Sequence, residues 1–516
     1  MTEVLISTPE VTTALETKPG ITRRDYLFAV AGGLALTFAY PPFPTGFLAY
    51  FVLVPLLYAL KEKTPKQHLF LAYLFGLAFN ATALFWTWRV TLPGTVGMIL
   101  ILALYWAAPF WVFGHSKKLW GHRAYWLLPF LLVGLEYFRT LGELAFPWTN
   151  LSYTQSYYTS WLQVLPFAGD TLLSFWIVLL NLLIFYALEN SGKKRWLGFA
   201  AAFVFWVAPG VYGARVLEKA RTAPVMKVAL LQGNIDSWSK WDAAFTQRSF
   251  DTYRELVFVA AAQGADFLVW PETAAPCYLL QEPNYLYQVM AMAQVAKKEM
   301  LVGTLAYRTF GPSEYLYYNS AYHFDTLGQP SIPYSKVHLV PFGETIPFSG
   351  RVEVLKDIHV GQADFTPGDS ILLLSSFSGP YAALICYEVV FPDLVRRFVL
   401  KGAKFLVGIT NDGWYGRTNG PYQHERMAAF RAVENRIPLV RAANSGISVA
   451  FDPYGRVISE GELFKKQIIM AEIPLRKETT FYARWGDFFP QGCFLISFLA
   501  LLSLVQAYVK RRFGIS

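Results

Sequence analysis

Cysteine is scarce in this sequence. Its 516 residues include only three, Cys277, Cys386 and Cys493, which are too few for a disulfide framework, and no spacing of Cys and His resembles a zinc site. A glycine-rich phosphate-binding loop is also missing from the sequence. We therefore expect no metal and no cofactor.

Charged residues are scarce as well, at 16%, whereas hydrophobic residues make up 54% of the chain. Because this balance exceeds the usual soluble range, we expect part of the chain to lie in lipid. The formal net charge of +9 could suggest a nucleic-acid partner, but Lys and Arg fall in short clusters beside apolar segments. Such clusters are typical of membrane topology signals, and we expect no binding of nucleic acid.

The N-terminus lacks the basic start, short apolar core and small-residue cleavage site of a signal peptide, so we expect the first apolar segment to be retained as an anchor. A helix needs about 20 apolar residues to span a bilayer. By this criterion the sequence predicts a membrane α-helical bundle of eight spans, at residues 24–41, 46–60, 68–87, 96–114, 124–141, 166–188, 196–213 and 488–509.

The loops between these spans differ in charge. Basic clusters occur before the first span, in every second loop and after the last span. The loops between them are nearly free of Lys and Arg, with Arg89 as the main exception. By the positive-inside rule, both termini lie in the cytoplasm and the segment before the last span lies outside. Polar residues within spans leave a transporter open as an alternative, although we find no internal repeat. The predicted parts are a cytoplasmic tail (1–23), seven transmembrane helices (24–213), an outer domain (225–475), the eighth helix (488–509) and a second cytoplasmic tail (510–516).

From Met226 onward, short β-rich runs alternate with amphipathic stretches, which predicts an α/β sheet covered by helices. The expected strands are residues 227–233, 265–270, 300–307, 320–325, 370–374, 381–385, 404–410, 439–443, 448–451 and 467–473. The expected helices are residues 243–263, 283–298, 392–401 and 420–435. In such sheets, functional groups lie beyond the carboxyl ends of the strands.

Three polar residues follow extended runs of this kind: Glu272, Lys336 and Cys386. Singly, they could be a helix cap, a solvated loop charge and a buried apolar side chain. Together they supply a base, a cation and a nucleophile. A carboxylate can take the proton of a thiol, and a cation can stabilise the oxyanion formed in acyl transfer. The sequence therefore indicates acyl chemistry at the Cys386 thiol.

The motifs around these residues resemble those of a known family. Three of them are similar to the Glu-Lys-Cys triad of the nitrilase superfamily: Trp270-Pro271-Glu272-Thr273, Tyr334-Ser335-Lys336 and Ile385-Cys386-Tyr387-Glu388. The membrane half and three further motifs resemble the apolipoprotein N-acyltransferase family in particular: Gln232-Gly-Asn-Ile-Asp236, Lys240-Trp241-Asp242 and Asn411-Asp-Gly-Trp-Tyr-Gly416. Thr345, where the family has an aromatic residue, and Ser152, where it usually has glycine, depart from the pattern without touching the triad.

The resemblance implies a nitrilase-like αββα sandwich on the periplasmic side of the bacterial inner membrane. It implies transfer of an acyl chain from a phospholipid, usually phosphatidylethanolamine, through a cysteine thioester to the amino group of a diacylated apolipoprotein. Cys386 would be the nucleophile, Glu272 the general base and Lys336 the oxyanion stabiliser. The positions that match supporting residues of the family are Trp241, Glu344, Tyr387 and Glu388. Two residues that follow a predicted strand could line the pocket, Asn411 and Trp414.

Other interpretations of the same residues stay open. A membrane-tethered amidohydrolase could use the same triad on small amides. Cys277 is a second candidate thiol, but it follows Pro276 in a loop-like segment and ends no strand, so we expect neither catalysis by it nor a disulfide with Cys386. His338 and His424 are expected to make structural hydrogen bonds, because a glutamate already supplies the base.

Overall fold

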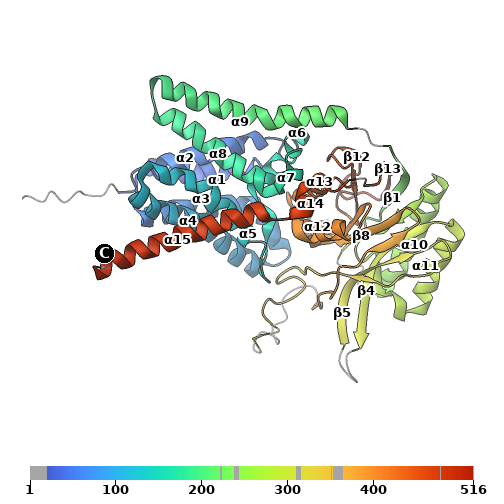
Figure 1. The fold of residues 1–516 in the computed structure, drawn as a ribbon. Helices are drawn as coiled ribbons and strands as arrows, with labels where there is room; N and C mark the ends of the chain where they lie inside the picture. Colours follow the sequence, from blue (N-terminus) through green and yellow to red (C-terminus); the bar gives the residue numbers. More distant parts are fainter. Residues whose placement is uncertain are drawn as a thin grey trace, which may run out of the picture.

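A helical region occupies one end of the molecule and an α/β domain the other (Figure 1). The computed structural model describes residues 20–220, 223–237, 243–309, 315–349, 351–352, 364–476 and 478–514. The helices of the helical region are α1 (Arg23–Thr37), α2 (Leu53–Ala59), α3 (Pro65–Ala83), α4 (Leu92–Trp120), α5 (Leu128–Phe138), α6 (Thr159–Leu162), α7 (Leu165–Ala168), α8 (Asp170–Glu189) and α9 (Gly192–Lys219). After the α/β domain the chain returns to this region through α14 (Phe481–Trp485) and α15 (Phe488–Phe513).

Local sequence signals explain where the first helices begin and end. Thr22 and Thr64 cap α1 and α3, and each forms a capping box with the side chain three residues later. The prolines that follow Tyr40 separate α1 from α2, as predicted, because proline cannot donate the hydrogen bond that a helix interior requires.

Four helical stretches within the described residues are long and apolar enough to cross a membrane: Leu92–Phe138, Asp170–Glu189, Gly192–Lys219 and Phe488–Phe513. They confirm the predicted membrane-embedded helical region. The count of eight spans stays a prediction, since α1 and α2 have only 15 and 7 residues and α3 is not among the four stretches. Large apolar side chains project outward from α9 and α15; Trp196 is 71% exposed and Leu495 is 55% exposed. Such surfaces suit contact with lipid.

The α/β domain contains two sheets. The strand order is β13-β1-β2-β4-β5-β6 in the first, with β3 paired beside β4, and β12-β11-β10-β9-β8-β7 in the second. The strands of the first sheet are β1 (Met226–Gln232), β2 (Phe267–Val269), β3 (Ala275–Tyr278), β4 (Glu299–Thr309), β5 (Tyr315–Phe324), β6 (Tyr334–Ser335) and β13 (Gln467–Ile473). Those of the second are β7 (Leu374–Ser376), β8 (Gly379–Ile385), β9 (Leu406–Thr410), β10 (Leu439–Ala443), β11 (Val449–Phe451) and β12 (Val457–Glu460).

The two sheets pack against each other, with β1 against β10 and β5 against β8. Two helices cover the outer face of the first sheet, α10 (Ala243–Ala262) and α11 (Pro283–Ala296), and two cover the second, α12 (Pro392–Leu400) and α13 (Gly420–Asn435). These four layers are the predicted αββα sandwich. Every residue of β9 and β10 is buried, as expected of parallel strands covered on both faces.

Two details of the predicted strands are wrong. The run 370–374 contributes only Leu374 to a strand, because the pairing of β7 with β8 is confined to the three residues before the tight turn, where Ser376 lies opposite Gly379. The segment around Cys277, interpreted as a loop, is strand β3. Among the described strands it pairs only with β4, and a strand with one side unpaired there tolerates Pro276, which has no N–H to donate.

Helix α9 packs very closely on α6. At Gly213 of α9, an added Cβ would overlap the carbonyl oxygen of Ser160, and a backbone atom cannot move aside as a flexible side chain can. Gly97 of α4 has open space around the same position.

We expect Gly213→Ala to lower the stability of the detergent-solubilised protein by about 1–3 kcal/mol, because the new methyl group forces α9 away from α6. The matched change Gly97→Ala should leave stability unchanged or raise it slightly, since alanine favours a helix. Thermal unfolding of the full chain measures both. Equal behaviour of the two variants would contradict the packing described here.

Candidate active site

Cys386 lies at a sharp turn that ends β8. The five residues before it, Tyr381–Ile385, are 0% exposed. Cys386 has a φ of 51° and begins a short 3₁₀ helix, η9 (Cys386–Val390). This left-handed conformation costs a residue with a side chain about 1–3 kcal/mol and persists only where the surroundings hold it.

Two hydrogen bonds hold the turn, one on each side of the Cys386 α-carbon. Glu388 Oε2 accepts from the N–H of Ile385 at 2.7 Å. His424 Nε2 lies 3.1 Å from the carbonyl oxygen of Cys386; a carbonyl oxygen can only accept, so Nε2 is the donor. His424 thus makes structural hydrogen bonds, as predicted.

His424 is itself held by a buried charged pair. Its Nδ1 lies 2.9 Å from Asp412 Oδ1 and 3.0 Å from Arg441 Nη2, and Arg441 donates to Asp412 Oδ2 at 2.6 Å. All three residues are at most 2% exposed. Although burial opposes charge on Asp412, Arg441 and His424 hold the pKa of its carboxyl well below the usual range. Asp412 therefore stays ionised and, together with Arg441, fixes the imidazole beneath the Cys386 turn.

Glu272 follows β2 and is anchored from three directions. Its Oε1 accepts from Asn319 Nδ2 at 2.8 Å, and its Oε2 accepts from the N–H of Asn411 at 2.9 Å. Lys336 follows β6, and its Nζ lies 3.7 Å from Glu272 Oε1. The same Nζ donates to Glu344 Oε1 at 2.8 Å. A lysine, two carboxylates and an amide thus form one connected network.

The charges of this network bear on the thiol. Burial works against charge on Lys336, but Glu344 and Glu272 raise the pKa of its ammonium above the ordinary value, so it is a permanent cation. At Cys386, burial is the largest effect and raises the pKa of the thiol; Glu272 adds to the rise and Lys336 opposes it. The thiol is therefore protonated at neutral pH and requires a base to ionise.

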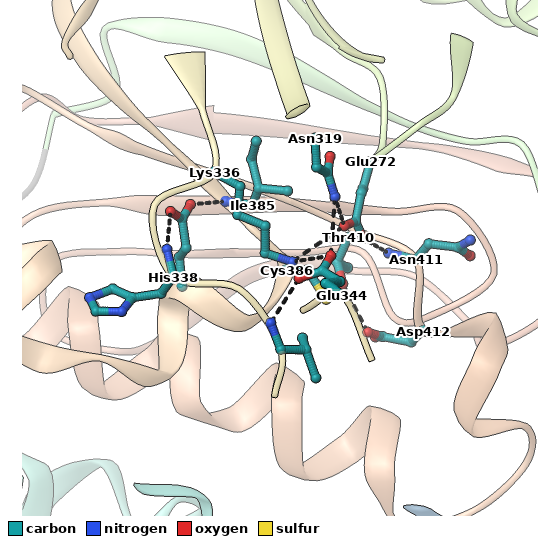
Figure 2. A network of polar contacts seen from close by, with 12 residues as sticks. Glu272, Asn319, Lys336, His338, Glu344, Ile385, Cys386, Thr410, Asn411 and Asp412 are labelled. Atoms are coloured by element: carbon teal, nitrogen blue, oxygen red, sulfur yellow. Dashed lines mark hydrogen bonds and ion pairs between the residues drawn. The ribbon is translucent and has the colours of Figure 1, made fainter. Parts of the chain in front are cut away.

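Glu272, Lys336 and Cys386 come from three separate strands and lie side by side (Figure 2). Beside them is a cavity of 440 Å³. Its described lining residues are Val90, Glu272, Thr273, Tyr278, Leu305, Tyr317, Asn319, Val340, Gly343, Glu344, Asp364, Phe365, Cys386, Asn411, Trp414 and Tyr415. The lining combines carboxylates near the thiol with apolar and aromatic side chains, a surface that can hold an apolar chain next to a reacting group.

The structure also places the predicted supporting residues. Glu344 binds Lys336, and its Oε2 accepts from the N–H of Val340 at 2.9 Å. The Asn411 backbone anchors Glu272, and Trp414 lines the cavity. Trp241 lies outside the described residues.

Glu388 and Tyr387 hold the turn from behind. Glu388 Oε1 accepts from Tyr334 Oη at 2.6 Å and from the N–H of Val337 at 2.7 Å, and burial raises the pKa of Glu388 to about 7. Tyr387 Oη donates to the carbonyl of Ala145 at 2.8 Å in the helical region. Glu388 thus connects the Cys386 turn to the segment that bears Lys336, and Tyr387 connects it to the membrane half.

Three residues of the site were not predicted: Asn319, Asp412 and Arg441. Each is polar and buried within or next to a strand, and buried polar groups require partners. That rule was the available signal, but without knowledge of which strands are neighbours it could not identify the partners.

The remaining candidates lie elsewhere or contribute differently. Cys277, Cys386 and Cys493 are free thiols, and burial raises the pKa of Cys277 to about 12, which disfavours its thiolate. The His338 ring stacks on Phe391 with centroids 4.2 Å apart, and only its backbone N–H approaches Glu388. The prediction of a structural hydrogen bond from the His338 side chain is therefore wrong within the described residues, where the ring packs on Phe391 instead.

Comparison with known proteins places the chain in a family. The family model for the apolipoprotein N-acyltransferase N-terminal domain matches residues 32–183, and the carbon-nitrogen hydrolase model matches residues 227–481. The apolipoprotein N-acyltransferase of Geobacter metallireducens is 36% identical over 508 residues, covering 95% of this chain and 96% of that protein. This chain belongs to the apolipoprotein N-acyltransferase family. The resemblance predicted from the motifs is confirmed.

Other members and solved structures extend the comparison. The apolipoprotein N-acyltransferase of Chlorobaculum tepidum is 29% identical over 521 residues, covering 95% of this chain and 97% of that protein. An amidase from Nesterenkonia sp. AN1, of the nitrilase superfamily, covers 48% of this chain and 94% of its own, with 22% identity and a TM-score of 0.38.

We expect His424→Leu to lower the turnover number for acyl transfer, the chemistry predicted for Cys386, by about 100-fold, because the reacting thiol loses its fixed position. The Michaelis constants should change little, since the cavity lining is intact. His424→Gln, which can still donate to the Cys386 carbonyl, should recover part of the loss. Steady-state kinetics on folded variants test this. A folded His424→Leu variant with unchanged turnover would contradict the positioning role.

Proposed function

We propose that this protein transfers an acyl chain from a phospholipid to the α-amino group of the N-terminal diacylglyceryl-cysteine of apolipoproteins. The observation that carries the proposal is the meeting of Glu272, Lys336 and Cys386 beside one cavity in a member of this family. Phosphatidylethanolamine is the proposed donor. No cofactor is needed for either transfer.

In the first half-reaction, Glu272 takes the thiol proton as Cys386 sulfur attacks the ester carbonyl of the donor. The negative charge that develops on the carbonyl oxygen is stabilised by Lys336, whose ammonium is fixed by Glu344 at 2.8 Å. A preorganised hydrogen-bond donor of this kind raises the turnover number by about 10²–10³-fold. The ester C–O bond then breaks, Glu272 returns its proton to the leaving alkoxide, and a lysophospholipid departs from a Cys386 thioester.

In the second half-reaction, the lipoprotein amine attacks the thioester carbonyl. Glu272 takes a proton from the attacking nitrogen, the C–S bond breaks, and the Cys386 thiolate regains a proton. The amide is more stable than the thioester, so this half runs downhill. The apolar lining of the cavity favours both substrates over water.

The proposed topology follows from charge and hydropathy. Residues 24–213 and 488–509 form the transmembrane part of a protein of the bacterial inner membrane. Residues 225–475 form the catalytic domain on the periplasmic side, and both termini lie in the cytoplasm. The basic clusters at alternate loops support this orientation.

We expect Cys386→Ala to abolish acylation of a diacylated lipopeptide, a loss of about 10³-fold or more, because no thioester can form. The matched variant Cys277→Ala should keep activity within about twofold, since that thiol lies in β3 and its ionisation is suppressed. Mass spectrometry of the lipopeptide measures both. The reverse pattern would overturn the assignment, and ammonia release from small amides without lipopeptide acylation would favour the amidohydrolase.

A further inference from the structure

Arg89 lies where the helical region borders the cavity. It ends the short 3₁₀ helix η2 (Phe85–Arg89) between α3 and α4, and the next residue, Val90, lines the cavity beside Cys386. Its guanidinium also lies close to the backbone of the α/β domain at Gly416. A Cβ added to that glycine would lie 2.8 Å from Arg89 Nε. Arg89 thus bridges the two parts of the molecule at the edge of the cavity.

A second arginine is next in sequence to the glycine that Arg89 approaches. Arg417 directly follows Gly416, and the two residues before that glycine, Trp414 and Tyr415, line the cavity. Arg89 and Arg417 are both exposed. Each lies over an aromatic ring, Arg89 over Trp88 at 5.7 Å and Arg417 over Phe464 at 5.0 Å. Within the described ranges, neither guanidinium forms an ion pair with a carboxylate.

The surroundings of Arg89 place it at the level of a lipid headgroup. Phe85, Trp88 and Leu92 are 40%, 52% and 61% exposed, next to the first turn of α4. Exposed aromatic side chains at the end of a membrane helix are typical of the interface between hydrocarbon and water. A cation at this depth faces the layer that contains lipid phosphates.

The charge of the cavity decides which part of a ligand these arginines can bind. Glu272, which is buried, and the partly buried Glu344 line the cavity beside the thiol and would repel a phosphate there. We propose that Arg89 and Arg417 bind the phosphate of the phospholipid donor at the rim, while its acyl chain extends toward Cys386. Arginine suits this task because its planar guanidinium can donate two hydrogen bonds to one phosphate. The inference rests on the proposed function.

This assignment separates the two substrates. The donor has a phosphate, whereas the diacylglyceryl-cysteine acceptor has none. The arginines should therefore act on thioester formation and leave discharge of the thioester by the acceptor unchanged.

The test measures acylation of Cys386 in mixed micelles against the concentration of phosphatidylethanolamine, by intact-protein mass spectrometry. For Arg89→Gln/Arg417→Gln, we expect the donor concentration at half-maximal rate to rise about tenfold, as for loss of a charge-assisted contact, with the maximal rate within about twofold. Arg89→Lys/Arg417→Lys should recover most of the affinity. Arg248→Gln, at an exposed position on α10, is the matched control.

Two further inhibition experiments identify which chemical group of the donor the arginines bind. A dialkyl ether phosphatidylethanolamine should inhibit the wild-type protein better than the double variant, and the corresponding dialkylglycerol should not distinguish them. Equal inhibition by inorganic phosphate and by the ether lipid would show a general anion site and overturn the proposal. The proposal would also be overturned if the double variant showed the same dependence on donor concentration as the wild-type protein. The same holds if, in the double variant, discharge of the thioester by a diacylated lipopeptide slowed as much as thioester formation. Failure of the wild-type protein to form any acyl-enzyme would instead refute the proposed function.

Discussion

The buried carboxylate of Glu388 connects the two segments of the site whose relative position must be fixed, the one that bears Cys386 and the one that bears Lys336. It accepts hydrogen bonds from Ile385, just before Cys386, and from Val337, just after Lys336. Both segments need such support, because the left-handed backbone of Cys386 is strained and β6 has only two residues. One side chain therefore holds the thiol and the cation at a fixed separation. Glu272 is held independently through Asn411, at the end of β9.

The same turn is connected to the membrane half. Gln423, the residue before His424 on α13, accepts hydrogen bonds from the indole N–H groups of Trp86 and Trp148 at 3.2 and 2.9 Å. The Tyr387 ring stacks on Trp148 and its hydroxyl binds the carbonyl of Ala145. The helical region therefore does more than anchor the α/β domain in lipid. It forms one wall of the packing around Cys386, as expected for a site whose substrates are lipids.

The sequence was informative where a pattern repeats locally. Helix α13 and strands β10 and β13 were predicted from β-rich runs that alternate with amphipathic stretches, and Glu272, Lys336 and Cys386 from their places after extended runs; the αββα arrangement was implied by the resemblance of the motifs. The pattern failed where pairing between distant segments decides the structure. Strand β3 contains a proline that a single-sided pairing with β4 tolerates, and Asp412 and Arg441 act together only because β9 and β10 are neighbours. Asn319 reaches Glu272 only through the pairing of β5 with β4 and of β4 with β2.

Mass spectrometry of peptides from the acylated protein measures whether Cys386 carries the acyl group. The purified protein is incubated with phosphatidylethanolamine in the absence of an acceptor, digested, and mapped. We predict one acyl group on the peptide that contains Cys386, removed by hydroxylamine and by a diacylated lipopeptide but not by small amides. A folded, lipid-exposed protein without an adduct, or with the adduct on Cys277, would contradict it.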